Sequence, residues 1–106
     1  MDRFILVLTT VPEEKRAQEI ARALVGERLA ACVTVSSACQ SLYWWEDRVT
    51  EDREYVLSIK TKASLYARLE KKLKELHPYE VPEIIALPIQ KGSRAYLDWL
   101  KKETAI

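Results

Sequence analysis

Two spacings of apolar residues alternate along this chain, and their order restricts the fold more than any other feature. A continuous apolar run over residues 3–9 (Arg-Phe-Ile-Leu-Val-Leu-Thr) predicts a strand buried on both faces. An apolar stripe with the i, i+3, i+4, i+7 spacing of a helix follows at Ala17, Ile20, Ala21 and Leu24. The chain is therefore expected to begin with a strand and then a helix.

Capping residues set the expected limits of this first helix. Thr10 and Glu13 have the three-residue spacing of a capping box, with Thr10 as the N-cap. Gly26 is a plausible stop, because glycine is common just beyond helix ends.

The next stretch is strand-like and predicts a hairpin. Residues 29–43 are expected to form one strand, residues 44–52 to contain the turn, and residues 53–61 to form the next strand. The mixed charges of residues 46–54 are typical of a solvated turn.

A second leucine stripe predicts a second helix that ends near Leu76, and its members are Leu65, Leu69, Leu73 and Leu76. Residues 83–89 are expected to form a further strand, and Pro88 places it at a sheet edge or at a bulge. Ser93 then caps a short last helix that carries Tyr96, Trp99 and Leu100 on one face.

This order predicts one α+β domain over residues 1–106, with a ferredoxin-like βαββαβ antiparallel sheet and an extra C-terminal helix. Two helices cover one face of such a sheet, and the terminal helix is too short to cover the other. We therefore expect a homo-oligomer that buries the open face.

Composition and charge argue against several classes of protein. Lys and Arg total 17 and Asp and Glu total 16, so the net charge of +1 argues against a nucleic-acid-binding protein. The N-terminal apolar run is too short for a signal sequence or a membrane span, which favours a cytoplasmic protein without a membrane partner. Cys32 and Cys39 have a spacing that places them on opposite strand faces, which disfavours a disulfide.

The most distinctive motif is residues 77–83 (His-Pro-Tyr-Glu-Val-Pro-Glu), which contains the chain's one histidine. Its prolines favour an extended connector. Because His77 follows a helix C-terminus, its pKa is expected to be raised if the ring is solvated. With Glu80 or Glu83, His77 could bind Cu(II) in an open, weak site. A further Glu, Tyr or Cys would have to complete the ligand set, and another subunit could supply it. The alternative is a plain helix stop before a strand.

Two further features allow a functional and a structural interpretation. Strand alternation sends Trp44 to one side and both Tyr43 and Trp45 to the other, where they form an interface anchor or a stacking wall for a flat ligand. Lys60 either extends its ammonium group to the rim or holds an anion. The chain lacks a Gly-rich phosphate loop, Cys-x-x-Cys, His-Glu-x-x-His and Gly-x-Ser-x-Gly, so no organic cofactor is expected.

Five sequence blocks together resemble the CutA divalent-cation-tolerance family over about residues 4–100: Leu-Ala-Ala-Cys-Val (29–33), Ser-Leu-Tyr-x-Trp (41–45), Ile-Lys-Thr (59–61), His-Pro-Tyr-Glu-Val-Pro-Glu (77–83) and Tyr-Leu-x-Trp (96–99). The resemblance implies a homotrimer with kinship to the PII signalling proteins and a link to copper and other divalent cations. It also implies that His77, Tyr79, Glu80, Lys60 and Trp45 line clefts between subunits.

Two positions depart from the family pattern: Asp47 stands where a glycine is usual, and Thr34 where an asparagine is frequent. The leading hypothesis is a non-enzymatic trimer that binds divalent ions and responds to them. Three alternatives remain: a PII-like module that takes a small anion through Lys60 and Trp45, an enzyme with His77 as acid–base and Glu80 as its orienter, and a structural trimer without ligand.

Overall fold

A computed structural model describes residues 3–105 of the chain. The elements follow in the order β1 (Phe4–Val11), α1 (Glu14–Gly26), β2 (Cys32–Val35), β3 (Cys39–Trp45), β4 (Arg48–Lys62), a short 3-10 turn (Ala63–Leu65), α2 (Tyr66–Leu76), β5 (Ile85–Ile89) and α3 (Arg94–Glu103). The expected α+β fold with an antiparallel sheet is confirmed.

The sheet is organised around β4, which is its longest strand. The strand order is β2-β4-β1-β5, and β3 pairs with the outer part of β4 beyond this path. β1 lies between β4 and β5, but the predicted burial of both its faces is wrong for the single chain. Val7 and Thr9 are buried, whereas Leu6 and Leu8, on the opposite face, are only half-buried because no helix covers that face. β5 is an edge strand, as Pro88 predicts, since a residue without an N–H is tolerated best at an edge.

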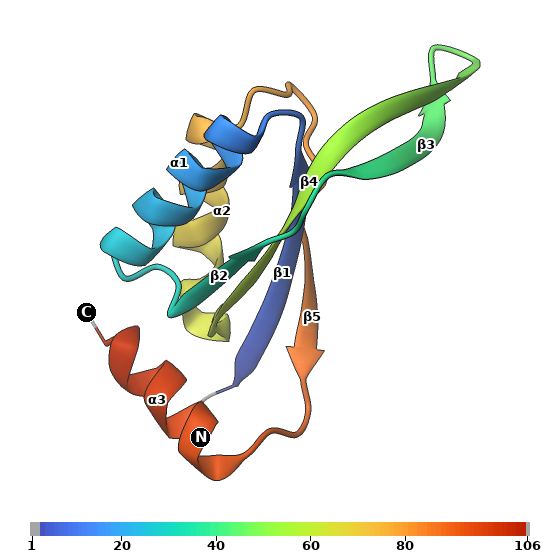
Figure 1. The fold of residues 1–106 in the computed structure, drawn as a ribbon. Helices are drawn as coiled ribbons and strands as arrows, with labels where there is room; N and C mark the ends of the chain where they lie inside the picture. Colours follow the sequence, from blue (N-terminus) through green and yellow to red (C-terminus); the bar gives the residue numbers. More distant parts are fainter. Residues whose placement is uncertain (1–2, 106) are drawn as a thin grey trace.

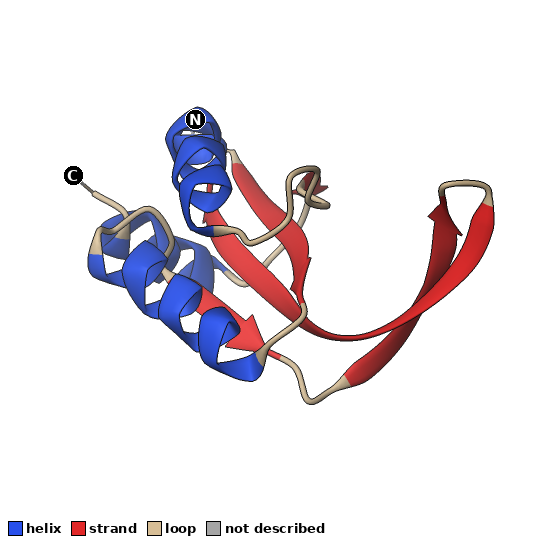
Figure 2. Cartoon of the chain, turned by 90° about the horizontal axis from the view of Figure 1, so that it is seen from above, coloured by secondary structure: helices blue, strands red, loops and turns tan. Residues whose placement is uncertain are grey.

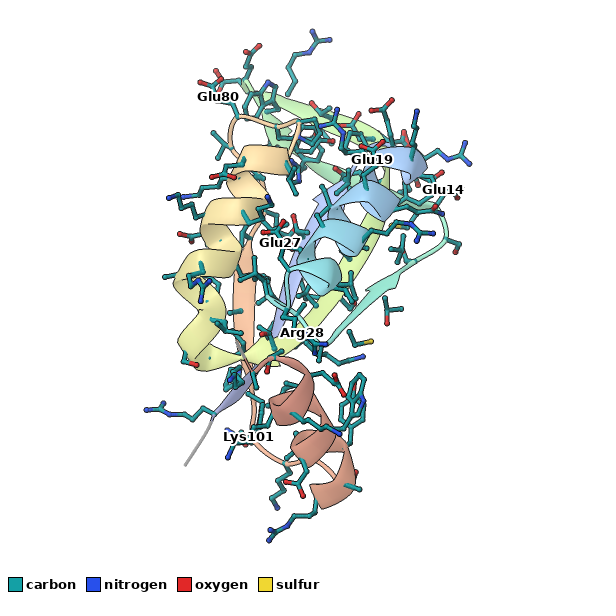
Figure 3. All side chains as sticks on the ribbon, turned by 90° about the vertical axis from the view of Figure 1, so that its left-hand side faces the viewer. Glu14, Glu19, Glu27, Arg28, Glu80 and Lys101 are labelled. Carbon is teal, nitrogen blue, oxygen red and sulfur yellow. The ribbon has the colours of Figure 1, made fainter. Side chains whose placement is uncertain are left out.

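One face of the sheet is buried beneath α1 and α2, which lie side by side upon it (Figure 1). The core joins the helix residues to alternate strand residues, and its buried members are Val7, Val11, Ala17, Ile20, Leu24, Leu29, Ala30, Leu57, Ile59, Leu69 and Leu73. The leucine stripe of α2 therefore packs as predicted. Figure 3 shows α3 at one end of the molecule, beyond α1 and α2. Its N-cap is the predicted Ser93, whose Oγ accepts a hydrogen bond from the Tyr96 N–H at 3.2 Å.

The opposite face, here called the outer face, carries Leu6, Leu8, Ser58, Lys60, Ile85 and Leu87, the residues that alternate with the buried set. Within residues 3–105, no helix lies across it (Figure 1). Ile85 and Leu87 remain 49% and 43% exposed, so the single chain leaves an apolar sheet face in contact with water.

The capping box predicted at Thr10 is wrong. Thr10 pairs with Val56 inside the β1–β4 ladder, and β1 continues to Val11. The N-cap of α1 is Glu13, whose side chain makes no capping hydrogen bond. Sheet pairing has overridden a local capping signal, because the ladder satisfies the backbone groups that a cap would otherwise serve.

The strand predicted over residues 29–43 is in fact two strands. Residues 36–38 interrupt it, and Ser36 holds the break: its N–H donates to the Val56 carbonyl oxygen at 2.9 Å, and its Oγ accepts the Val56 N–H at 2.8 Å. The turn predicted within residues 44–52 is confirmed. It consists of Glu46 and Asp47, which have φ values of 50° and 63°, and the residues on both sides of it continue the β3 and β4 ladder.

The result is a long hairpin, residues 39–54, which we call the arm. It projects from the sheet and curves away from the helices (Figure 2). The chain is accordingly elongated, with extents of 45 × 25 × 24 Å. Leu42, Trp44 and Val49 are exposed on the arm, so this projection displays large apolar side chains that one chain does not bury.

Candidate functional site

The residues that the sequence marks as functional lie mainly where the arm faces the segment after α2. The helix ends at Leu76, and His77 is its C-cap with φ −76° and ψ 135°, an extended conformation that a residue before proline favours. Pro78 and Pro82 then carry the chain to β5 without regular structure. This segment ties the end of α2 to the base of the arm.

His77 is buried, with 7% of its surface exposed, and both ring nitrogens have partners. The Tyr79 N–H donates to Nδ1 at 3.1 Å, so Nε2 carries the proton and donates it to the Thr10 carbonyl oxygen at 2.8 Å. This neutral tautomer joins the connector to β1. In its present hydrogen bonding, His77 holds no free lone pair for a metal ion.

The electrostatics of His77 also differ from expectation. Burial lowers its pKa from the ordinary value, and this outweighs the Thr10 carbonyl and Glu54, which favour the charged ring. The expectation of a raised pKa assumed a solvated ring, and the fold removes that solvent. A buried neutral imidazole is therefore the resting state near pH 7.

Glu80 and Glu83 are exposed on the connector, and no hydrogen bond within residues 3–105 joins either of them to His77. Figure 3 shows Glu80 at the end of the molecule opposite α3 and Lys101. The part of the chain that the structure describes contains no group of three or more His, Cys, Asp or Glu side chains able to hold a metal ion. His77 is thus not oriented by Glu80, and the described residues of one chain do not assemble a chelating site.

A cavity of about 650 Å³ opens between the arm and the connector. We call it the arm cavity, and its lining residues are Thr10, Ser41, Leu42, Tyr43, Trp45, Glu54, Pro78, Tyr79, Glu80, Val81 and Glu83. Tyr43 and Trp45 both face it while Trp44 is absent from the lining, which confirms the predicted alternation of these aromatic residues. The cavity therefore brings together Trp45, Tyr79, Glu80 and Glu83, four of the six predicted site residues.

The cavity wall contains a carboxylate that sequence reasoning missed. Glu54 is 5% exposed, and its Oε2 accepts a hydrogen bond from the Tyr79 hydroxyl at 2.8 Å. Burial, followed by this hydrogen bond to Glu54, raises the Tyr79 pKa well above its usual range, so the phenol stays protonated. Grouping Glu54 with the solvated turn charges was wrong. The available signal was strand parity, because the β3–β4 register places Glu54 on the same side of the arm as Tyr43 and Trp45.

The hydroxyl of Tyr43 makes a matching contact farther along the arm. It donates a hydrogen bond to Asp52, and this hydrogen bond, followed by burial, raises the Tyr43 pKa. Two tyrosine–carboxylate pairs therefore fix the cavity walls, one from the connector to β4 and one across the arm. They orient both phenol rings beside the cavity.

Lys60 lies elsewhere. It sits half-buried on the outer face, in register with Leu6 and Cys32. It is twelve residues along β4 from Arg48, the partner of Trp45, which corresponds to about 40 Å of extended strand. Within one chain Lys60 and Trp45 do not meet, so a ligand that contacts both would have to lie between two chains.

Both cysteines are free thiols, as expected, and both are half-buried. Cys32 is on the outer face beside Lys60, while the Sγ of Cys39 donates to the Glu54 carbonyl oxygen at 3.2 Å. Asp47, at the position where the family usually has glycine, occupies the left-handed region at the tip of the arm. Thr34 is exposed on β2 beside Ser58 and does not line the cavity.

These features define a small α+β protein with a projecting arm and an acidic, aromatic cavity at its base. Residues 5–103 match the family model of the CutA1 divalent ion tolerance protein. The chain is 52% identical over 99 residues to the divalent-cation tolerance protein CutA of Thermus thermophilus, covering 93% of this chain and 96% of that protein. The chain therefore belongs to the CutA divalent-ion-tolerance family.

Solved structures of CutA proteins have the same fold as this chain. The Thermus thermophilus divalent cation tolerance protein superposes with a TM-score of 0.93 at 50% identity, covering 99% of this chain and all of that one. The CutA1 crystal structure from Oryza sativa gives a TM-score of 0.95 at 44% identity, covering 97% of this chain and 94% of that one. This chain spans 56% of the full-length rice relative.

The description of a third relative names a cellular compartment for that protein. The structure from Archaeoglobus fulgidus, described as a periplasmic divalent cation tolerance protein, has a TM-score of 0.91 at 32% identity and covers 99% of this chain and all of that one. In the part of the present chain that is described, no helix is both long and apolar enough to cross a bilayer.

Proposed function

We propose that this protein is a non-enzymatic homotrimer, ferredoxin-like in its protomer and PII-like in assembly, that binds copper or other divalent ions in clefts between its subunits. It would be located in the cytoplasm and would take part in the response of the cell to metal ions. The observation that carries the proposal is the arm cavity, whose exposed Glu80 and Glu83 lie beside an unpartnered apolar arm. Carboxylates on a surface that another chain would cover are placed to ligate an ion shared between chains.

The number of ligands supports a site between subunits. Among residues 3–105, three metal-ligating side chains do not converge at any point, whereas stable binding of a divalent transition ion needs several ligands. Glu80 and Glu83 fit the role of ligands because they are exposed and free of described ion pairs. His77 would join them only by releasing the Tyr79 N–H from Nδ1, so we assign it to a bound state in which the connector has shifted.

The apolar outer face and the arm support the trimer. A sheet face that leaves Ile85 and Leu87 half-exposed, together with the exposed Trp44, is the kind of surface that association buries. Light scattering at micromolar concentration should give three times the chain mass. A Leu87→Lys variant, which places a charge on the outer face, should shift the protein to smaller species. A stable wild-type monomer would refute the assembly.

Native mass spectrometry during a Cu(II) titration tests the metal site. We expect saturable uptake in the wild-type protein that is lost in the Glu80→Gln/Glu83→Gln double variant and weakened in His77→Ala. Glu14→Gln removes an equally exposed carboxylate from α1 and is the matched control. Uptake that persists unchanged in the double variant would place the metal elsewhere. Cell fractionation of the tagged protein tests the cytoplasmic location.

The PII-like alternative, a site for a small anion, needs two subunits, because Lys60 and Trp45 are far apart within one. Its support is that Lys60 lies on the outer face that the proposed assembly would cover. An anion whose binding is abolished by Lys60→Ala and preserved in His77→Ala would favour it over metal binding.

A further inference from the structure

The connector separates the imidazole of His77 from the arm cavity. Tyr79 and Thr10, which provide the two hydrogen-bond partners of the ring, both line the cavity, whereas His77 does not. The rings of His77 and Tyr79 are tilted by 43° with their centroids 5.1 Å apart. The imidazole therefore lies directly behind the cavity wall, and Tyr79 is the part of the wall that covers it.

Residues 78–83 of the connector have little backbone support. Within the described chain, none of them takes part in a backbone–backbone hydrogen bond, although the His77 N–H just before them donates to the Leu73 carbonyl oxygen at 2.8 Å. Pro78 and Pro82 have no N–H to donate. Val81 is 76% exposed. Segments with few hydrogen bonds and high exposure are those that open locally at low free energy.

Tyr79 makes both hydrogen bonds that hold residues 78–83 in place among the described residues. Its N–H donates to Nδ1 of His77 at 3.1 Å, and its hydroxyl donates to Oε2 of Glu54 at 2.8 Å. Glu54 is a buried residue of β4, so the second contact fastens the segment to the sheet. We call these two hydrogen bonds the Tyr79 latch. Their release would free the segment and the Nδ1 lone pair together.

We propose that residues 78–83 form a gate over His77 that the Tyr79 latch keeps closed, and that opening of the gate presents Nδ1 to the arm cavity beside Glu80 and Glu83. This inference rests on the proposed metal site and deepens it, because it names the conformational step that controls access to one ligand. A ligand that needs His77 binds only the open form, so its apparent affinity is reduced by the fraction of chains that is open.

Chemical modification of the imidazole measures the opening without any metal. Diethyl pyrocarbonate acylates an imidazole nitrogen only when its lone pair is free, and His77 is the chain's one histidine. The assembled, metal-free protein is treated at pH 7.5, where the imidazole is neutral, and the product is followed by ultraviolet absorbance and located by peptide mass mapping. We expect the wild-type protein to react far more slowly than N-acetylhistidine under the same conditions.

Two variants weaken the Tyr79 latch from its two sides. Tyr79→Phe removes the hydroxyl and should accelerate the modification of His77 by about tenfold or more, because a hydrogen bond to a charged group is lost. Glu54→Gln removes the charge of the acceptor and should accelerate it several-fold. Guanidinium unfolding of each variant checks that the chain remains folded at pH 7.5, so that the rate reports local opening.

Two further tyrosine variants are matched controls. Tyr66→Phe removes a hydroxyl that donates to Glu70 at 2.9 Å on α2, and Tyr43→Phe removes the hydrogen bond to Asp52 across the arm. Neither contact touches residues 78–83, so both variants should react at the wild-type rate. Equal acceleration in Tyr79→Phe and in either control would show general loosening and would overturn the gate. A wild-type rate equal to that of N-acetylhistidine would also overturn it.

A Cu(II) titration of Tyr79→Phe separates this inference from the proposed function. We expect several-fold tighter uptake than in the wild-type protein, because a larger fraction of chains is open. Faster modification of Tyr79→Phe with no copper uptake by either protein would refute the metal site and leave the gate standing. Copper uptake by the wild-type protein, with modification no faster in Tyr79→Phe, would overturn the gate and leave the metal site standing.

Discussion

The buried imidazole of His77 should make the stability of the protein depend on pH in a narrow and predictable window. Burial lowers its pKa in the folded chain, whereas the unfolded chain titrates near 6.5. Between those two values the unfolded chain binds a proton that the folded chain does not. The stabilising contribution of neutral His77 to the free energy of unfolding is therefore complete above about pH 6.5, and it is lost progressively as the pH decreases below that value.

The size of the effect follows from one proton per chain. Where the unfolded chain is protonated and the folded chain is not, the slope approaches about 1.4 kcal/mol per pH unit. Because the chain has a single histidine, no other imidazole contributes, and most carboxylates titrate below about pH 5. Guanidinium unfolding at fixed chain concentration, repeated between pH 5.5 and 7.5, measures the slope.

A variant and a direct titration check the cause. His77→Gln removes the titrating group and should flatten the profile, while lowering stability at pH 7.5 by about 2 kcal/mol through lost buried hydrogen bonds. NMR titration of the single imidazole resonance reports the folded pKa itself. An imidazole pKa at or above 6.5, or a wild-type profile as flat as that of the variant, would refute the assigned burial and hydrogen bonding.

Three further predictions concern single side chains, and guanidinium unfolding at fixed chain concentration measures each of them. Thr9→Val should stabilise the protein by about 1 kcal/mol, because the fully buried Thr9 hydroxyl has no hydrogen-bond partner among the described residues; a loss of stability would mean that it has one. Asp47→Gly should add about 1 kcal/mol, because glycine adopts the φ of 63° without a side-chain penalty; an unchanged midpoint would count against strain at this turn. Tyr79→Phe should cost about 2 kcal/mol by leaving buried Glu54 without its donor, and a neutral result would show that solvent already reaches that carboxylate.

The two helices that cover the sheet show what a local pattern predicts well. The i, i+3, i+4, i+7 stripe of residues 17–24 became a buried helix face, and so did the leucine stripe of residues 65–76, although its first member, Leu65, lies in the 3-10 turn before α2. Such periodicity is a property of the helix itself, because residues three and four apart share a face in any tertiary setting. The edge position of β5 was predicted similarly from Pro88, because proline lacks a backbone N–H in any tertiary setting.

The arm shows where local patterns fail. Residues 44–52 combine charges with aromatic side chains, and both are compatible with a turn or with a solvated strand pair. The structure makes them strands because β3 pairs with an extended β4 on both sides of a two-residue turn. Ladder pairing joins residues distant in sequence, so neither the length of the arm nor the break at residues 36–38 can be read from neighbouring residues.

The features of the candidate site also fall into those that local sequence predicts and those that tertiary packing decides. By itself the sequence determined that residues 77–83 form a connector without helix or strand, that Tyr43 and Trp45 share a side, and that the chain resembles the CutA family, since these depend on backbone restriction, strand alternation and residue identity. The tertiary structure alone decided that His77 is buried and neutral, that Glu54 turns into the cavity to meet Tyr79, and that Lys60 lies far from Trp45. Burial and convergence depend on which distant segments pack together, and a linear pattern does not contain that information.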